Sequence, residues 1–183
     1  MPHPLSPLGI AHTVVSLAPL AAGVVALTRH RAIDPRTRAG LVYLAGLTLS
    51  VLTSFGLSSS GGFNAGHALG ILALLAAFGS IAVRCFTFLG RARPYLAAAG
   101  MSFSFFLLLV PGINETLTRL PATRPLATGP ESPVVRTALL AWLVIFVVGS
   151  AAQAIADSSG PRYNGPSLTG HRASGALVGR LLR

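Results

Sequence analysis

The chain has 183 residues, of which 52% are hydrophobic and only 10% are charged. Soluble domains carry roughly a quarter charged residues, so this composition excludes an ordinary soluble fold. All 14 basic residues are arginine, and the formal net charge is +10. Because the arginines lie between apolar segments and not on one soluble face, they indicate membrane topology and contact with anionic lipid, and we expect no nucleic-acid partner.

Five apolar segments have the length of a membrane span. Each is about 20 residues long, and a helix rising about 1.5 Å per residue crosses roughly 30 Å of hydrocarbon in that length. The sequence therefore predicts an all-α, polytopic transmembrane helical bundle, formed by a single domain over residues 1–158, in a multi-pass protein of the cell membrane. The predicted spans are 8–28, 39–58, 65–84, 95–113 and 134–156.

The arginines alternate between the two ends of these spans. Eleven lie in the first connection, the third connection and the C-terminal tail, whereas three lie in the fourth connection and the start of the last span. Positive charge accumulates on the cytoplasmic side of membrane proteins, so we predict that the N-terminus lies outside and the C-terminus in the cytoplasm. Residues 159–183 are predicted to be a basic cytoplasmic tail, either a short helix on the inner leaflet or a segment without fixed structure.

Two histidines stand near the start of apolar segments, where ionisable groups are uncommon. His12 lies about four residues past the outer end of the first span, roughly 6 Å deep, and His67 lies about three residues into the third span, roughly 4.5 Å deep. Ser16 follows His12 by one helical turn. Asn114 and Glu115 close the fourth span on the same side. The shared depth predicts a polar cluster in the outer leaflet, contributed by three helices.

Small residues predict how the helices pack. Gly66 and Gly70 form a GxxxG pair in the third span, and Gly46, Ser50 and Ser54 form a small-residue row in the second. Such rows let helix backbones approach closely. If the first and third spans pack through the GxxxG pair, the two imidazoles come within roughly 10 Å of each other.

The outer acidic residue has an alternative partner within its own helix. If the fourth helix continues outward, Arg119 stands one turn beyond Glu115 and offers it an ion pair. Such a pair would make Glu115 a structural residue and not a ligand.

Three functions are open for the histidine cluster. His12 and His67 could bind haem b or a transition metal in a redox or assembly role, since neutral imidazole ligates both. They could instead be interhelical hydrogen-bond glue in a non-catalytic structural subunit or a transporter-like bundle. The third function is the transport or sensing of a proton. The expected partners are membrane lipid and a membrane protein or a second copy, and the chain contains no P-loop, nucleophile elbow, GxGxxG or HExxH motif that would predict catalysis.

Several stretches resemble a known bacterial family. These are "IAHTVVSLAPLAAGVVAL", "AGLVYLAG", "GGFNAGHALGILAL" and "SFFLLLVPGINETLTRLP", which together cover roughly residues 8–126. The chain resembles the predicted-membrane-protein family named domain of unknown function 2306. The resemblance implies a polytopic inner-membrane protein and supports the choice of His12, His67 and Glu115, but it implies no reaction.

Overall fold

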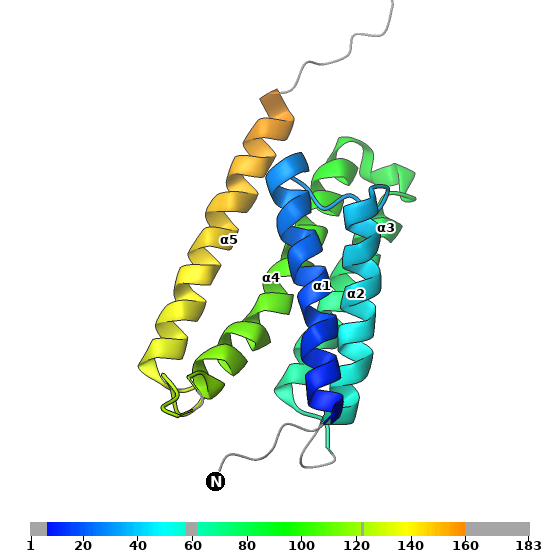
Figure 1. The fold of residues 1–183 in the computed structure, drawn as a ribbon. Helices are drawn as coiled ribbons and strands as arrows, with labels where there is room; N and C mark the ends of the chain where they lie inside the picture. The colour runs from blue at the N-terminus through cyan, green and yellow to red at the C-terminus, as the bar shows by residue number, and fades with distance from the viewer. Residues whose placement is uncertain (1–6, 58–61, 122, 160–183) are drawn as a thin grey trace, which may run out of the picture.

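The computed structural model describes residues 7–57, 62–121 and 123–159 as a bundle of five long helices that run alternately up and down (Figure 1). All five are long and apolar enough to cross a membrane. The all-α bundle and its five predicted spans are therefore confirmed, and the chain has the architecture of a multi-pass membrane protein. The helices are α1 (Pro7–His30), α2 (Arg38–Ser54), α3 (Ala65–Val83), α4 (Arg93–Arg119) and α5 (Pro133–Ser159).

Short-range polar contacts determine where α2 begins and ends. The Thr37 hydroxyl accepts a hydrogen bond from the Gly40 N–H at 3.0 Å, which satisfies one of the free donors at the helix start. After Ser54 the chain tightens into the 3₁₀-helix η1 (Phe55–Leu57), where the sequence predicted a single helix to residue 58. A second 3₁₀-helix, η2 (Thr87–Ala92), precedes α4 within the predicted third connection.

Helix α4 is longer than predicted. The predicted span ends at residue 113, but the helix continues through Pro111 to Arg119. Proline removes only one helical hydrogen bond. The turns that follow it are stabilised by the Thr116 hydroxyl, which donates to the Gly112 carbonyl at 2.7 Å, and by an ion pair between Glu115 and Arg119. The extension brings the polar residues of this stretch onto a helix instead of a loop.

The core lies among α1 to α4. Its largest fully buried side chains include Tyr43, Leu47 and Met101, and the Tyr43 hydroxyl is 2.7 Å from the Ser104 hydroxyl across the α2–α4 interface. The main helix pairs are α1 with α2, α2 with α3, α3 with α4, and α4 with α5.

Two small-residue patterns have different outcomes. A Cβ atom at Gly46 would lie 2.6 Å from the Pro19 Cδ, so the row in α2 packs closely against α1, a neighbour that the sequence did not identify. Gly70, in contrast, lies against Val51 of α2, since a Cβ there would be 3.2 Å from a Val51 methyl. The condition that α1 packs on α3 through the GxxxG pair is therefore not met, because α3 packs mainly on α2 and α4.

Helix α5 lies beside α4 at the edge of the bundle (Figure 1). No residue of its most apolar 18-residue window is buried. The contact with α4 is aromatic: the rings of Phe106 and Phe146 have centroids 4.8 Å apart, and Trp142 Nε1 donates to the Phe106 carbonyl at 3.1 Å. Most of α5 is thus free to contact lipid or another protein.

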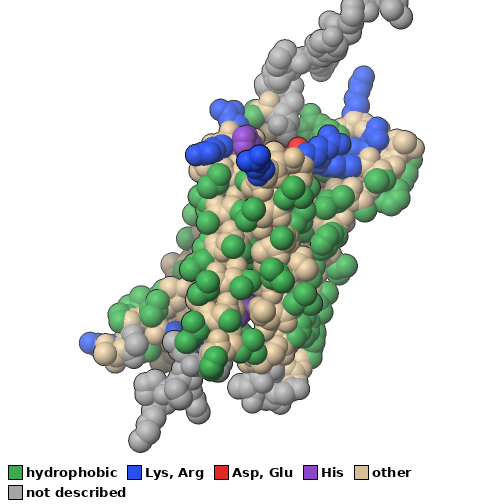
Figure 2. Space-filling view, turned by 45° about the vertical axis from the view of Figure 1, so that its right-hand side comes forward, with side chains coloured by type: hydrophobic (Ala, Val, Ile, Leu, Met, Phe, Trp, Pro, Cys, Tyr) green, Lys and Arg blue, Asp and Glu red, His purple; other side chains and the backbone are tan. Residues whose placement is uncertain are grey.

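Arginine side chains gather at one end of the molecule, while hydrophobic side chains cover its sides (Figure 2). This arrangement arises because α1 and α3 end where α2 and α4 begin. Asp34 and Arg84 form an ion pair at 3.2 Å that joins two of these connections. The arginines of residues 7–57, 62–121 and 123–159 therefore alternate between the two ends as predicted, and the N-outside orientation stays a prediction. The predicted tail at 159–183 lies, beyond Ser159, outside the described residues.

Candidate functional site

His12 connects α1 to α2 near the end of the bundle opposite the arginine-rich connections. Its Nδ1 is 2.8 Å from the Thr53 hydroxyl. That hydroxyl donates to the carbonyls of Leu49 and Ser50, at 2.9 and 3.0 Å, so it accepts the Nδ1–H of His12. The remaining nitrogen, Nε2, is then the acceptor of the neutral ring, and it lies 3.4 Å from the Ser16 hydroxyl.

Ser16 extends this contact along the α1–α2 interface. Its hydroxyl lies 2.6 Å from the hydroxyl of Ser50, which is a member of the small-residue row in α2. The row therefore has two roles, because its glycine permits close approach and its serine supplies a hydrogen bond between the helices. His12, Ser16, Ser50 and Thr53 form one network, which we call the α1–α2 polar network.

His67 is held by the start of its own helix and by the end of α2. The Asn64 side chain accepts from the His67 N–H at 3.1 Å, and His67 Nδ1 accepts from the Asn64 N–H at 3.2 Å. These reciprocal bonds form a capping box with histidine in the position where glutamate or glutamine is usual. With Nδ1 as acceptor, Nε2 carries the proton and donates to the Ser54 carbonyl at 3.1 Å.

The His67 ring is also covered by aromatic side chains. It is stacked on Phe55, with centroids 4.6 Å apart and planes 8° apart, and it contacts Phe63 at 5.8 Å. The residue is 4% exposed. A neutral, buried imidazole with both nitrogens bonded therefore explains why a histidine is present at the start of an apolar helix.

The two histidines approach α2 from different sides and meet adjacent residues, Thr53 and Ser54. They share one depth in the bundle, as predicted, but α2 links them and no hydrogen bond joins them directly in the described part of the chain.

The two α4 residues that were predicted to join the polar cluster, Asn114 and Glu115, differ in their contacts. The Glu115 carboxylate pairs with Arg119 in the next turn of α4. The Asn114 side-chain oxygen is buried and has no hydrogen-bond partner within the described residues. The ion pair foreseen from the sequence is present, and it gives Glu115 a structural partner.

The donor groups differ in their availability to a cofactor. His67 would have to give up a capping bond or its bond to α2 before it could bind a metal, whereas His12 Nε2 has only the long contact with Ser16. Across residues 7–57, 62–121 and 123–159, no group of three or more histidine, cysteine, aspartate or glutamate side chains could hold a metal ion. The geometry therefore does not fit haem held by both histidines without rearrangement, and ligation by these residues stays a prediction.

Sequence reasoning did not identify the partners on α2, which are Ser50, Thr53 and the Ser54 carbonyl. The available signal was the small-residue row itself, since serine and threonine recur on the face that meets α1. Asn64 was also missed, although asparagine directly before an apolar helix is a usual N-cap.

Fold and site together define a class: a multi-pass helical membrane protein with hydrogen-bonded histidines between its helices. Comparison with protein-family models, curated proteins and solved structures found no match to this chain. The resemblance to the family named domain of unknown function 2306 thus stays a prediction.

Proposed function

We propose that the chain is a non-catalytic helical membrane subunit, structural or transporter-like, in which His12 and His67 join α2 to its two neighbours. One observation carries this proposal: all four ring nitrogens of the two histidines lie within hydrogen-bond distance of a protein group. A ligand-binding histidine would normally keep one nitrogen for its ligand.

The physical reason lies in the cost of burying a polar group. An imidazole N–H without a partner in an apolar environment costs several kcal/mol, so a histidine persists there when its bonds are satisfied. Lipid provides no hydrophobic drive between helices, and polar contacts with close backbone packing hold them together instead. His12 supplies such a contact between α1 and α2, and His67 supplies one between α2 and α3.

A double-mutant cycle tests the His12 contact. We expect His12→Ala and Thr53→Val to show a coupling energy of about 0.6 kcal/mol, the average for hydrogen bonds between membrane helices. The measurement is the free energy of unfolding in mixed micelles. Thr48→Val is the matched control, because among the described residues the Thr48 hydroxyl bonds only to Leu44 of its own helix, and it should show no coupling to His12. Equal coupling in both cycles, or none in either, would contradict the proposal.

Binding of haem or a metal is the second candidate, and one observation favours it. The 3.4 Å contact between His12 Nε2 and Ser16 is the weakest of the four, so this nitrogen could exchange its partner for a metal at the lowest cost. A redox or assembly role would follow from this candidate and not from the first.

The cellular setting is part of the proposal. Positive-inside topology supports the cell membrane, with the N-terminus outside and the arginine-rich end in the cytoplasm. In this orientation His12 and His67 lie in the outer half of the bilayer.

A further inference from the structure

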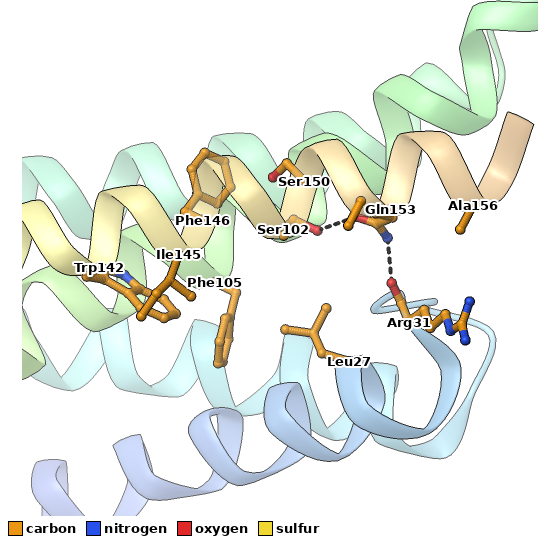
Figure 3. Close-up of a pocket in the computed structure, with 12 residues that line it drawn as sticks. Leu27, Arg31, Ser102, Phe105, Trp142, Ile145, Phe146, Ser150, Gln153 and Ala156 are labelled. Atoms are coloured by element: carbon orange, nitrogen blue, oxygen red, sulfur yellow. Dashed lines mark hydrogen bonds between the residues drawn. The ribbon is translucent and has the colours of Figure 1, made fainter.

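A groove lies between α1, α4 and α5 in the half of the bundle nearest the arginine-rich end. It has a volume of about 360 Å³, which falls within the size range of small-ligand sites. Leu27 of α1 and Arg31, which directly follows α1, face side chains of α4 and α5 across it (Figure 3). The groove exists because α5 packs along α4 and leaves the end of α1 uncovered on that side.

The lining changes from apolar to polar along the groove. The apolar, aromatic part of the groove is formed by Phe105, Trp142 and Phe146. Toward the arginine-rich end, the Ser102 hydroxyl donates to Gln153 Oε1 at 3.1 Å, and Gln153 Nε2 donates to the Arg31 carbonyl at 2.7 Å (Figure 3). A molecule with one apolar and one polar end would match this order.

Two observations indicate that the groove has room and an unused polar group. The Ser150 hydroxyl is buried and has no hydrogen-bond partner among the described residues. A Cβ atom at Gly149 would meet nothing within 4 Å. A buried hydroxyl without a partner is unusual in proteins, and the open space at Gly149 shows that this side of α5 can accommodate a larger group.

Arg31 gives the polar end a positive charge. It follows α1 with a φ of 57°, and its N–H bonds to the Leu27 carbonyl at 3.0 Å, so the helix end fixes its position. Its side chain is exposed. The three described carboxylates that form ion pairs, those of Asp34, Glu115 and Glu131, pair with other arginines.

We propose that this groove binds an anionic membrane phospholipid. One acyl chain lies against the aromatic part, and the phosphate lies at Arg31. The level of the groove supports this occupant, because Arg31 stands at the end of a membrane-spanning helix, where lipid headgroups lie, and anionic lipids are abundant in the cytoplasmic leaflet. If a second copy of the chain occupied the groove instead, its binding would not need the positive charge of Arg31.

Native mass spectrometry of the purified, delipidated full chain tests the site by titration with phosphatidylglycerol and phosphatidylcholine. An arginine at a membrane surface contributes about 1 kcal/mol toward anionic lipid, so we expect phosphatidylglycerol to bind about five-fold more tightly. Arg31→Gln should bring the two affinities close together. Arg29→Gln is the matched control, since Arg29 is exposed at the same helix end but does not line the groove.

A second substitution tests the space. Gly149→Leu should fill the groove and weaken the binding of both lipids at least ten-fold, whereas Gly79→Leu, at an exposed α3 position that is equally open, should change neither. Far-UV circular dichroism checks that each variant folds. If the Gly149→Leu protein does not fold, the Arg31→Gln protein still tests the site. Unchanged binding in a folded Gly149→Leu protein would overturn the proposal. So would a groove substitution that dissociates a dimer while lipid binding stays the same.

Discussion

His67 offers a substitution series that separates a structural histidine from a ligand. His67→Ala removes the bond from Nε2 to the Ser54 carbonyl, the bond from the Asn64 N–H to Nδ1, and the stacking on Phe55. His67→Gln should retain the capping bond, because glutamine is one of the usual residues at this position of a capping box. Glutamine loses the ring but keeps an amide near Asn64.

The expected cost follows from these contacts. A hydrogen bond between membrane helices is worth about 0.6 kcal/mol, a helix cap about 1 kcal/mol, and an aromatic pair about 0.5–1.5 kcal/mol. Because such terms are not fully additive, we expect His67→Ala to destabilise the fold by about 2 kcal/mol, and His67→Gln by about 1 kcal/mol. For a chain of this size, 1 kcal/mol corresponds to about 2–4 °C in Tm.

Thermal unfolding in detergent, followed by far-UV circular dichroism, measures the difference. Tm should fall by about 4–8 °C for His67→Ala and by about half as much for His67→Gln. His30→Ala is the control, since His30 is exposed at the C-terminal end of α1, far along the bundle from His67. This substitution should leave Tm unchanged. If glutamine destabilises the protein as much as alanine, or if alanine has no effect, the structural reasoning for His67 is refuted.

Three further outcomes follow from the packing and the topology. Gly46→Val should lower stability by about 1–3 kcal/mol, because a Cβ at this position would lie 2.6 Å from a proline atom of α1; an unchanged Tm would show that the two helices can separate freely. Tyr43→Phe should cost about 1 kcal/mol, because it removes a buried bond to Ser104, and a neutral result in the same unfolding assay would contradict this. A topology reporter placed at Thr128 should report a position outside the cytoplasm, and a reporter fused after Arg183 should report a position in the cytoplasm. A cytoplasmic signal at Thr128 would refute the predicted orientation.

The extent of sequence-based prediction differs between the fold and the site. Five spans could be predicted because hydrocarbon thickness imposes a minimum apolar length on each helix. The continuation of α4 to Arg119 could not, because the prolines from Pro121 onward indicate a loop, while the bond of Thr116 and the ion pair of Glu115 exist only once the helix has formed.

For the site, the depth of the histidines could be predicted from the sequence, but their bonding partners could not. Counting residues from the span ends correctly predicted that His12 and His67 share one depth, and that Ser16 lies beside His12. Sequence order does not specify which helices are neighbours, so the partners on α2 were not predicted. The bonds to Thr53 and to the Ser54 carbonyl depend on the packing of α2 between α1 and α3.

The absorption spectrum and metal content of the purified full chain test the central claim most directly. If His12 and His67 are hydrogen-bonding residues between helices, the protein expressed with excess haem precursor and purified in mild detergent should show no Soret band and no stoichiometric metal. His12→Ala and His67→Ala should then change its stability alone. A Soret band or bound metal present at one equivalent, and lost in His12→Ala while the protein remains folded, would contradict the claim and establish the ligand role instead.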